Sequence, residues 1–289
     1  MLRSFNSGVN GMKAFQSRMD VIGNNIANSN TTGFKSDRTS FGDAFSQTLR
    51  EASPGDGIRS GNTSLQVGSG VSLTAISTRH IQGALSQTGV TTDLAISGEG
   101  FFTVRDSASG REFATRAGDF RVDTSGYLVT TSGLRVQGFS DAAKTTRGDI
   151  QVNATGAPAG TDPTAGVAAF SFDNAGALHV RLNDSTGTEF VRAQVLLQSF
   201  IDPQQLKKEG VNLYSNIAGA GPLGGATPTS AAAGSAGLGS IEAGALELSN
   251  VDLAEEFTGL ITGQRGFQAS ARLITTSDEM LQEVINLKR

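Results

Sequence analysis

Apolar residues recur in alternating steps of three and four near both ends of the chain. The first run covers residues 2–26 and the second covers residues 253–285. This spacing is typical of a helix with one narrow, heptad-like apolar seam, so we predict a helix at each end. The predicted seam residues are Leu2, Phe5, Val9, Met12, Met19 and Ile26 with the neighbouring Ile22 in the first helix, and Leu253, Phe257, Leu260, Phe267, Ile274, Leu281 and Ile285 in the second.

Polar residues interrupt both seams, at Gln16 in the first helix and at Gln264 and Asp278 in the second. A lone helix cannot bury a seam, so we expect the two helices to pack together, bury both seams and bring the termini close. The polar positions cost stability in a closed pair and are easier to explain where register or contacts with other copies are specified. An ordinary helical pair in a globular core remains the alternative.

The two predicted helices have polar signals at their inner ends. The first is followed by the sequence GNNIANSNTTG, whose Asn24, Asn25 and Asn28 predict an ordered turn, because Asn tolerates left-handed backbone and caps backbone groups. The second is expected to begin with a cap at Ser249 or Asn250. Its acidic first turns and its basic last residues, Lys288 and Arg289, suit the helix dipole.

The middle of the chain has short alternating runs separated by turn residues, which indicates β-strands. Residues 94–104 are predicted as strand, tight turn and strand. Residues 120–129 and 170–179 share an alternating run, an Asp-x-x-Gly turn and a returning run, so we predict a hairpin at each. Residues 154–166 and 218–240, rich in Gly, Ala, Pro and Thr or Ser, are predicted to be loops or linkers.

The predicted fold class is therefore α+β, with paired N- and C-terminal helices in coiled-coil-like packing and one or two β-rich middle domains. The division follows the change from helical to strand periodicity. The expected domains are a terminal helical assembly domain (1–34 with 248–289), a linker or extension (35–70), a β-rich core domain (71–140 with 190–247) and a smaller β-hairpin outer insertion (141–189).

Composition limits the possible chemistry. The 289 residues carry a net charge of -4, no cysteine and two histidines, His80 and His179. A slightly acidic chain lacks the field that attracts nucleic acid, and without cysteine it has no disulfide or thiolate metal site. The GEG turn at 98–100 lacks the third Gly of a dinucleotide motif, and the DTSG turn at 123–126 has the wrong spacing for an aspartic protease. We predict no enzyme activity, no catalytic residue, no cofactor and no metal.

The sequence also limits how the protein could enter or cross a membrane. We find no apolar run near the ~20 residues that span a bilayer, and the N-terminus lacks a basic stretch followed by an apolar core. We expect no membrane insertion and no cleaved signal peptide. If the protein leaves the cytoplasm, another route must carry it.

Motifs at both ends resemble those of the flagellar rod and hook protein family. They are MDVIGNNIAN with TTGFK in residues 19–35, LSNVDLAEEF at 248–257, and QRGFQ with TTSDEMLQ in residues 264–282. In the middle, DLAISGEGFF and TRAGDF within residues 93–120 resemble the β core of that family. The resemblance covers nearly the whole chain and is weakest over 141–166 and 219–240.

The resemblance implies a structural subunit that crosses the membrane unfolded through the flagellar type III export apparatus and polymerises with its own copies. The terminal helices would form the inner layer of a tube, with the seam residues, Gln264 and Asn24, Asn25 and Asn28 as assembly interface. Further partners would be the other rod proteins, the hook cap and the hook–filament junction. The protein would lie in the hook or basal body, outside the cell or across the periplasm.

Within the family, the sequence RGFQASAR at 265–272 and the ending VINLKR are more similar to hook proteins than to distal rod proteins. A hook subunit, part of a flexible joint that transmits torque, is therefore expected, with a distal rod subunit as the alternative. The short chain and the stretch 53–70 favour that alternative. Phe41 and Phe45 resemble a segment recognised by export gates, and a helix face that packs locally is an equal explanation.

Two other classes are compatible with parts of the sequence. An extracellular adhesin fits the Gly- and Thr-rich middle but leaves the paired terminal seams unexplained. A hydrolase would need an active site around His80 or His179, and neither histidine lies in a recognisable catalytic frame.

Overall fold

The computed structural model divides into two compact units and has the predicted α+β architecture, with a helix at each end and strands between them. The first unit contains residues 1–28, 36–79 and 251–289, and the second contains residues 29–35 and 80–250. The structure describes residues 2–52, 61–158, 166–184, 187–222, 231–235 and 237–287, without the side chains of residues 2, 3 and 231.

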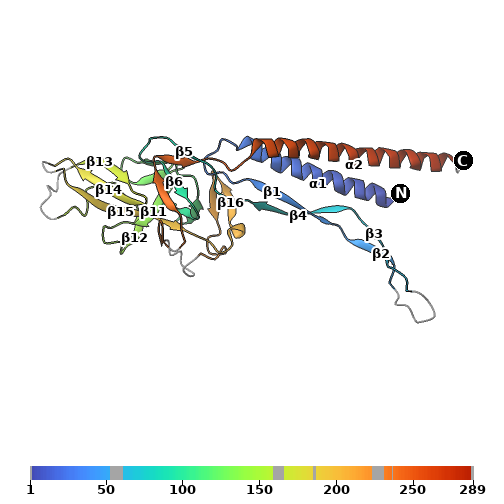
Figure 1. The fold of residues 1–289 in the computed structure, drawn as a ribbon, viewed down its shortest axis with the longest axis horizontal. Helices are drawn as coiled ribbons and strands as arrows, with labels where there is room; N and C mark the ends of the chain where they lie inside the picture. The colour runs from blue at the N-terminus through green and yellow to red at the C-terminus, as the bar shows by residue number, and fades with distance from the viewer. Residues whose placement is uncertain are drawn as a thin grey trace. The chain divides into compact units, whose positions relative to one another are not determined.

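The terminal helices of the first unit, α1 (Leu2–Ala27) and α2 (Leu253–Leu287), lie side by side (Figure 1). They are antiparallel, because Gly8 of α1 lies beside Leu273 and Ile22 of α1 lies beside Gly259. The prediction of a helix at each end is confirmed.

The start of α2 differs from the prediction. Asp252 is its cap, because the Oδ1 atom of Asp252 accepts hydrogen bonds from the backbone N–H of Ala254 (2.8 Å) and Glu255 (3.3 Å). The predicted cap at Ser249 or Asn250 is wrong, since both residues precede the turn that Asp252 closes. The predicted basic end, Lys288 and Arg289, lies outside the described residues.

The same unit contains an antiparallel β-ribbon. Its inner part pairs β1 (Asp37–Asp43) with β4 (Val71–Thr78), and its outer part pairs β2 (Ser46–Arg50) with β3 (Leu65–Gly68). Ala44 links the two parts through a backbone hydrogen bond to the Gly70 carbonyl (2.7 Å). The range 35–70, expected as linker or extension, thus contains three of these strands.

Most strands of the second unit join one sheet. Among its described residues the sheet has twelve strands, with the continuous order β13-β14-β15-β11-β7-β8-β17-β16 and with β9, β10, β12 and β18 attached beside this path. Two smaller pairs, β5–β20 and β6–β19, complete the unit. The bounds are β5 Leu85–Gln87, β6 Leu94–Ser97, β7 Phe101–Arg105, β8 Glu112–Thr115, β9 Phe120–Val122, β10 Leu128–Thr130, β11 Arg135–Phe139, β12 Arg147–Asp149, β13 Val167–Phe172, β14 Ala177–Leu182, β15 Glu189–Gln198, the 3-10 helix η1 Pro203–Gln205, β16 Lys207–Gly210, β17 Leu213–Ser215, β18 Ala231–Ala232, β19 Ser240–Ala243 and β20 Ala245–Glu247.

The two predicted Asp-x-x-Gly hairpins are confirmed. Asp123 turns β9 into β10, and Asp173 turns β13 into β14. In each turn the Gly N–H donates to the Asp carbonyl at 2.9 Å, and the Gly has a positive φ (82° at Gly126, 76° at Gly176). Asp supplies side-chain acceptors for such turns, and Gly adopts the left-handed conformation at little cost.

The strand, turn and strand predicted for residues 94–104 are present as β6 and β7, but the two strands do not pair with each other as a hairpin. The first strand, β6, pairs with β19, which lies about 140 positions later in the sequence. The second strand, β7, pairs with β8, β11 and β15. Gly98 has φ 116° and lies so near Gly239 that an added Cβ would meet the Gly239 Cα at 2.8 Å. The chain therefore leaves β6 beside a distant segment instead of folding back.

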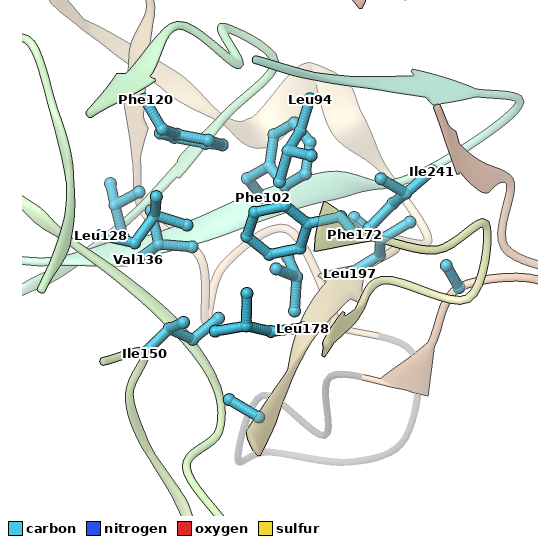
Figure 2. Close-up of a cluster of buried hydrophobic side chains, with 14 of the residues drawn as sticks. Leu94, Phe102, Phe120, Leu128, Val136, Ile150, Phe172, Leu178, Leu197 and Ile241 are labelled. Carbon is cyan, nitrogen blue, oxygen red and sulfur yellow. The ribbon is translucent and has the colours of Figure 1, made fainter. Parts of the chain in front are cut away.

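The Phe101–Phe102 doublet in β7 separates two cores, because successive strand residues point to opposite faces. Phe102 lies in the larger core with Leu178 and Ile150, and its ring meets that of Phe120 edge to face at 5.1 Å (Figure 2). Phe101 lies in a smaller aromatic cluster that includes Phe200 and Tyr214. The sheet is thus fixed by apolar packing on both faces of β7.

Candidate assembly interface

In the contact between α1 and α2, large side chains of one helix pack against glycines of the other, which have no side chain. A Cβ added at Gly266 would lie 2.5 Å from the Phe15 ring, and one at Gly263 would lie 3.3 Å from Met19. Phe15 and Met19 of α1 therefore occupy space that any larger residue of α2 would fill.

The arrangement is reciprocal toward the start of α1. A Cβ added at Gly8 would lie 3.1 Å from Ile274, and one at Gly11 would lie 3.0 Å from the Ser270 hydroxyl. Both glycines are buried, as is Ser277. The Ser277 hydroxyl donates to the Leu273 carbonyl of its own helix at 2.7 Å, so its burial leaves no donor unsatisfied.

The predicted mutual burial of the two apolar seams is wrong for α2. The buried residues of α2 are Gly263 and Ser277, whereas Leu253, Phe257 and Ile285 of the predicted seam are 44%, 50% and 64% exposed. The physical reason is that small residues allow a closer helix approach than a seam of Leu and Phe. On the described side chains, Ile22 is buried, Phe5 is exposed, and Val9, Met12, Met19, Ile26, Leu260, Phe267, Ile274 and Leu281 are half-buried.

The polar seam positions Gln16, Gln264 and Asp278 are exposed, so they lie outside this contact. The predicted Leu2 side chain lies outside the described residues. Because α2 buries small residues, it leaves an outer patch with one exposed apolar residue every four positions: Leu253, Phe257 and Ile261. This spacing places the outer patch on one face of the helix.

Asn25 joins three elements of the first unit. It is 1% exposed, and its amide nitrogen donates to the Asp37 carbonyl (2.9 Å) and to Glu256 Oε1 (2.8 Å), while its amide oxygen accepts from the Asp37 N–H (3.0 Å). The end of α1, the start of β1 and the first turn of α2 are thereby connected. Burial raises the pKa of Glu256, and the hydrogen bond from Asn25 opposes that shift.

The neighbouring asparagines have a local role. The side chain of Asn28 donates to the carbonyl of Asn24 (2.9 Å) and to its side-chain oxygen (3.0 Å), and the Asn28 N–H also bonds the Asn24 carbonyl. The predicted capping turn is thus present. The sequence pattern could not show that Asn25, alone of the three, is buried between distant segments.

Phe41 and Phe45 lie in or beside a strand. Phe41 is half-buried in β1 opposite Leu73, and Phe45 follows β1 with 85% of its surface exposed. The alternative explanation, a helix face that packs locally, is therefore wrong. Recognition of these residues by the export gate stays a prediction.

Sequence reasoning missed a buried ion cluster in the second unit. Glu247 accepts from Lys35 Nζ at 2.6 Å and from Arg116 Nη1 at 3.2 Å, and all three side chains are at most 4% exposed. Burial lowers the pKa of Lys35, and the nearby Glu247 carboxylate partly opposes this shift. Lys35 belongs to the TTGFK motif, but no local signal connects it with a carboxylate 212 positions away.

His80 lies between the rings of Phe101 and Tyr214, with centroid distances of 5.7 and 5.8 Å. Burial lowers the pKa of His80 to about 4, and the cations Lys35, Lys208 and Arg116 add to this shift. His179 lies 3.3 Å from Glu189 and 3.6 Å from Asp173 through different ring nitrogens. Within the part of the chain that the structure describes, three or more metal-binding side chains gather nowhere, and neither helix is long and apolar enough to cross a membrane.

A helix pair made from both ends of the chain, with a β-rich middle, is the architecture expected for axial subunits of the flagellum. Comparison with protein families supports this class. Residues 5–35 match the profile described as "Flagella basal body rod protein", residues 95–180 match "Flagellar hook protein FlgE/F/G D1 domain", and residues 242–287 match "Flagellar basal body rod FlgEFG protein C-terminal".

Full-length relatives agree with these profiles. The chain is 40% identical to the flagellar basal-body rod protein FlgG of Bacillus subtilis over 289 residues, which covers all of both chains. It is 33% identical to FlgG of Caulobacter vibrioides, covering 99% of this chain and 100% of that one. It is also 28% identical to the flagellar hook protein FlgE of Borreliella burgdorferi over 448 aligned positions. The chain belongs to the flagellar rod and hook protein family, whose members are structural proteins and not enzymes.

The Phe15–Gly266 contact predicts that Gly266→Ala weakens the helix pair. In a helix interior Gly→Ala normally stabilises by about 1 kcal/mol, but here the added methyl group meets the Phe15 ring and overpacking of this kind costs about 1–3 kcal/mol. The urea midpoint of the helical circular dichroism signal of the assembled polymer should fall. Gly23→Ala, where a Cβ meets nothing within 4 Å, is the control and should raise it. An equal rise in both variants would contradict the proposed contact.

The environment of His80 predicts acid sensitivity of the second unit. Its pKa is lowered to about 4, whereas an unfolded histidine titrates near 6.5, so only the unfolded chain takes up this proton between those pH values. Stability should therefore fall as the pH drops from about 6.5 to 4, by roughly 2 kcal/mol after allowance for partial exposure. The fluorescence of the two tyrosines, Tyr127 and Tyr214, reports on this unit during urea unfolding.

His80→Phe should remove this part of the pH dependence, and His179→Gln should leave it in place. Asp119 has a pKa raised by burial and contributes with the opposite sign, but it is present in every variant and cancels in the comparison. The interpretation fails if His80→Phe and the native chain lose the same stability between pH 6.5 and 4.

Proposed function

We propose that this chain is a subunit of the distal rod of the bacterial flagellum. The observation that carries the proposal is the match to FlgG of Bacillus subtilis, in which the 289 aligned positions equal the length of this chain and cover both proteins completely. FlgG of Borreliella burgdorferi matches in the same way, at 32% identity over 291 positions and all of both chains.

The hook subunit favoured by the sequence motifs is the second candidate. The hook protein of Treponema pallidum is 49% identical over 140 residues, but these are 48% of this chain and 30% of that protein. The full-length hook match needs 448 positions, so that relative has segments for which this chain has no counterpart. The equal chain length and the higher identity over the full length, 40% against 28%, therefore outweigh the hook-like sequence at 265–272.

The composition of α2 supports a terminal domain that becomes ordered on assembly. Gly259, Gly263 and Gly266 disfavour an isolated helix, and hydroxyl groups such as that of Thr258 bond carbonyls of the preceding turn. Such a helix depends on packing for its stability. Export as an unfolded chain through the flagellar type III apparatus, with Phe41 and Phe45 as export signal, fits this dependence.

In the assembled rod, the terminal helices would form coiled-coil-like contacts within and between copies. The α2 positions that meet α1, at 259, 263, 266 and 270, are separated by steps of four, three and four, as in a heptad seam. The outer patch of α2 would pack on a neighbouring copy, because contacts that do not close on themselves generate helical polymers. The predicted domains, with 141–189 as outer insertion, and the cap, junction and rod partners belong to the same proposal.

Immunoelectron microscopy with an antibody against this protein distinguishes the candidates. Label that appears on flagellar bases only after the outer membrane is removed is expected for a distal rod subunit. Label on short curved structures outside intact cells would instead assign the chain to the hook. Absence of label from flagellar structures in both preparations would overturn the axial assignment.

The exposed outer patch predicts that Phe257→Ala weakens polymerisation more than folding. Phe257 is half exposed in the single chain, so truncation should cost little there, whereas covering it in the polymer is worth about 1–1.5 kcal/mol. The critical concentration for polymerisation should therefore rise roughly tenfold. Ile201→Ala, at an exposed apolar residue of the other unit, is the control and should change it little. Normal polymerisation of the Phe257 variant would remove the outer patch from the interface.

A further inference from the structure

The chain passes between its two units four times, after residues 28, 35, 79 and 250. The segments next to three of these passages, those at 35, 79 and 250, are held within the second unit by one buried cluster around Glu247. None of the segments 29–35, 80–84 and 248–250 is a strand, so their positions depend on individual hydrogen bonds and on packing.

Glu247 contacts two of these segments directly. Its backbone carbonyl accepts from the Gly33 N–H at 2.8 Å, and its Oε1 atom accepts from Lys35 Nζ at 2.6 Å and from the Gly83 N–H at 2.8 Å. Glu247 itself lies at the end of β20, three residues before the last residue of the unit, Asn250. Glu247 therefore binds the segments 29–35 and 80–84 directly, and it is joined to the third segment, 248–250, along the chain.

The carbonyl of Ile81 closes the cluster. It accepts from Lys35 Nζ at 2.7 Å and from the side-chain amide of Asn250 at 3.1 Å. The side chain of Gln82 fixes the same segment to the sheet region by accepting from the Gly98 N–H at 2.8 Å. Each of the three segments is thus hydrogen-bonded to another of them.

Arg116 connects the cluster with the β sheet. It lies just after β8, with Nη1 3.2 Å from Glu247 Oε2 and Nη2 donating to the Gly98 carbonyl at 3.0 Å. Its guanidinium carbon also lies over the Phe101 ring, 5.2 Å from the ring centroid, within the distance of a cation–π contact. The cluster is therefore anchored to the smaller aromatic core.

Stability alone does not explain this cluster. Buried ion pairs are frequently replaced by apolar residues without loss of stability, because removal of charges from water is costly. Apolar residues cannot reproduce two directional hydrogen bonds, the one that Glu247 accepts from the Gly83 N–H and the one that Lys35 donates to the Ile81 carbonyl. We propose that Glu247 is a mechanical junction that ties the three segments together, so that a pull or twist arriving along one is shared by all and passed to the sheet. That such a load reaches the chain rests on the proposed function as a rod subunit.

Hydrogen–deuterium exchange of the full-length chain tests the junction. In Glu247→Gln, amides in peptides covering 29–36, 79–84 and 245–250 should all exchange at least about tenfold faster. A peptide from β14 should keep its native rate, since its burial does not depend on the cluster. Glu112→Gln, which breaks the partly exposed pair with Arg147, is the matched control and should leave the three peptides unchanged.

A triple variant, Lys35→Met with Arg116→Met and Glu247→Leu, separates positioning from stability. Its urea midpoint should be near the native value, while exchange in the three peptides stays fast. Native exchange rates in the triple variant would overturn the proposal, as would faster exchange confined to the Gly83 peptide in Glu247→Gln. These measurements use the purified chain, so failure of the junction and failure of the rod assignment are distinguishable.

Discussion

The close approach of α1 and α2 depends on three glycines of α2, which have no side chain. Gly259, Gly263 and Gly266 leave room for Ile22, Met19 and Phe15 respectively, and this interlock sets which faces of both helices remain outside. Because α2 is held through its small residues, its large apolar residues are left for other contacts. A helix that used Leu and Phe for the internal contact would have little apolar surface left for polymerisation.

The glycines also weaken α2 as an isolated helix, and this cost has a physical consequence for assembly. A helix with poor intrinsic propensity is ordered only where packing supplies the missing stability. The internal contact with α1 supplies part of this stability, and packing of a neighbouring copy against the outer patch would supply more. The same residues therefore link close packing within the chain to dependence on neighbours, which suits a subunit that must stay unassembled until it reaches its site.

Periodicity and local turn chemistry made much of the fold predictable. The terminal helices, the α+β class and the hairpins at Asp123 and Asp173 follow from patterns that a few neighbouring residues determine. Both strands of residues 94–104 are present, but they pair with strands that are distant in sequence instead of with each other, which no local pattern indicates. The prediction that the two apolar seams bury each other was wrong for a related reason. Hydrophobicity indicates an apolar surface but does not distinguish a contact within the chain from one between copies.

The buried polar contacts of the two units also could not be predicted, because they join residues that are far apart in the sequence. Asn25 and Lys35 both lie in recognisable motifs, yet their partners Glu256 and Glu247 are 231 and 212 positions away. In both cases a buried polar side chain near the N-terminal motif meets a carboxylate near the C-terminal motif. Polar bonds of this kind fix geometry more than they add stability, because their desolvation offsets much of their strength. The paired end motifs of the chain can therefore be understood as two halves of the same contacts, one pair within each unit.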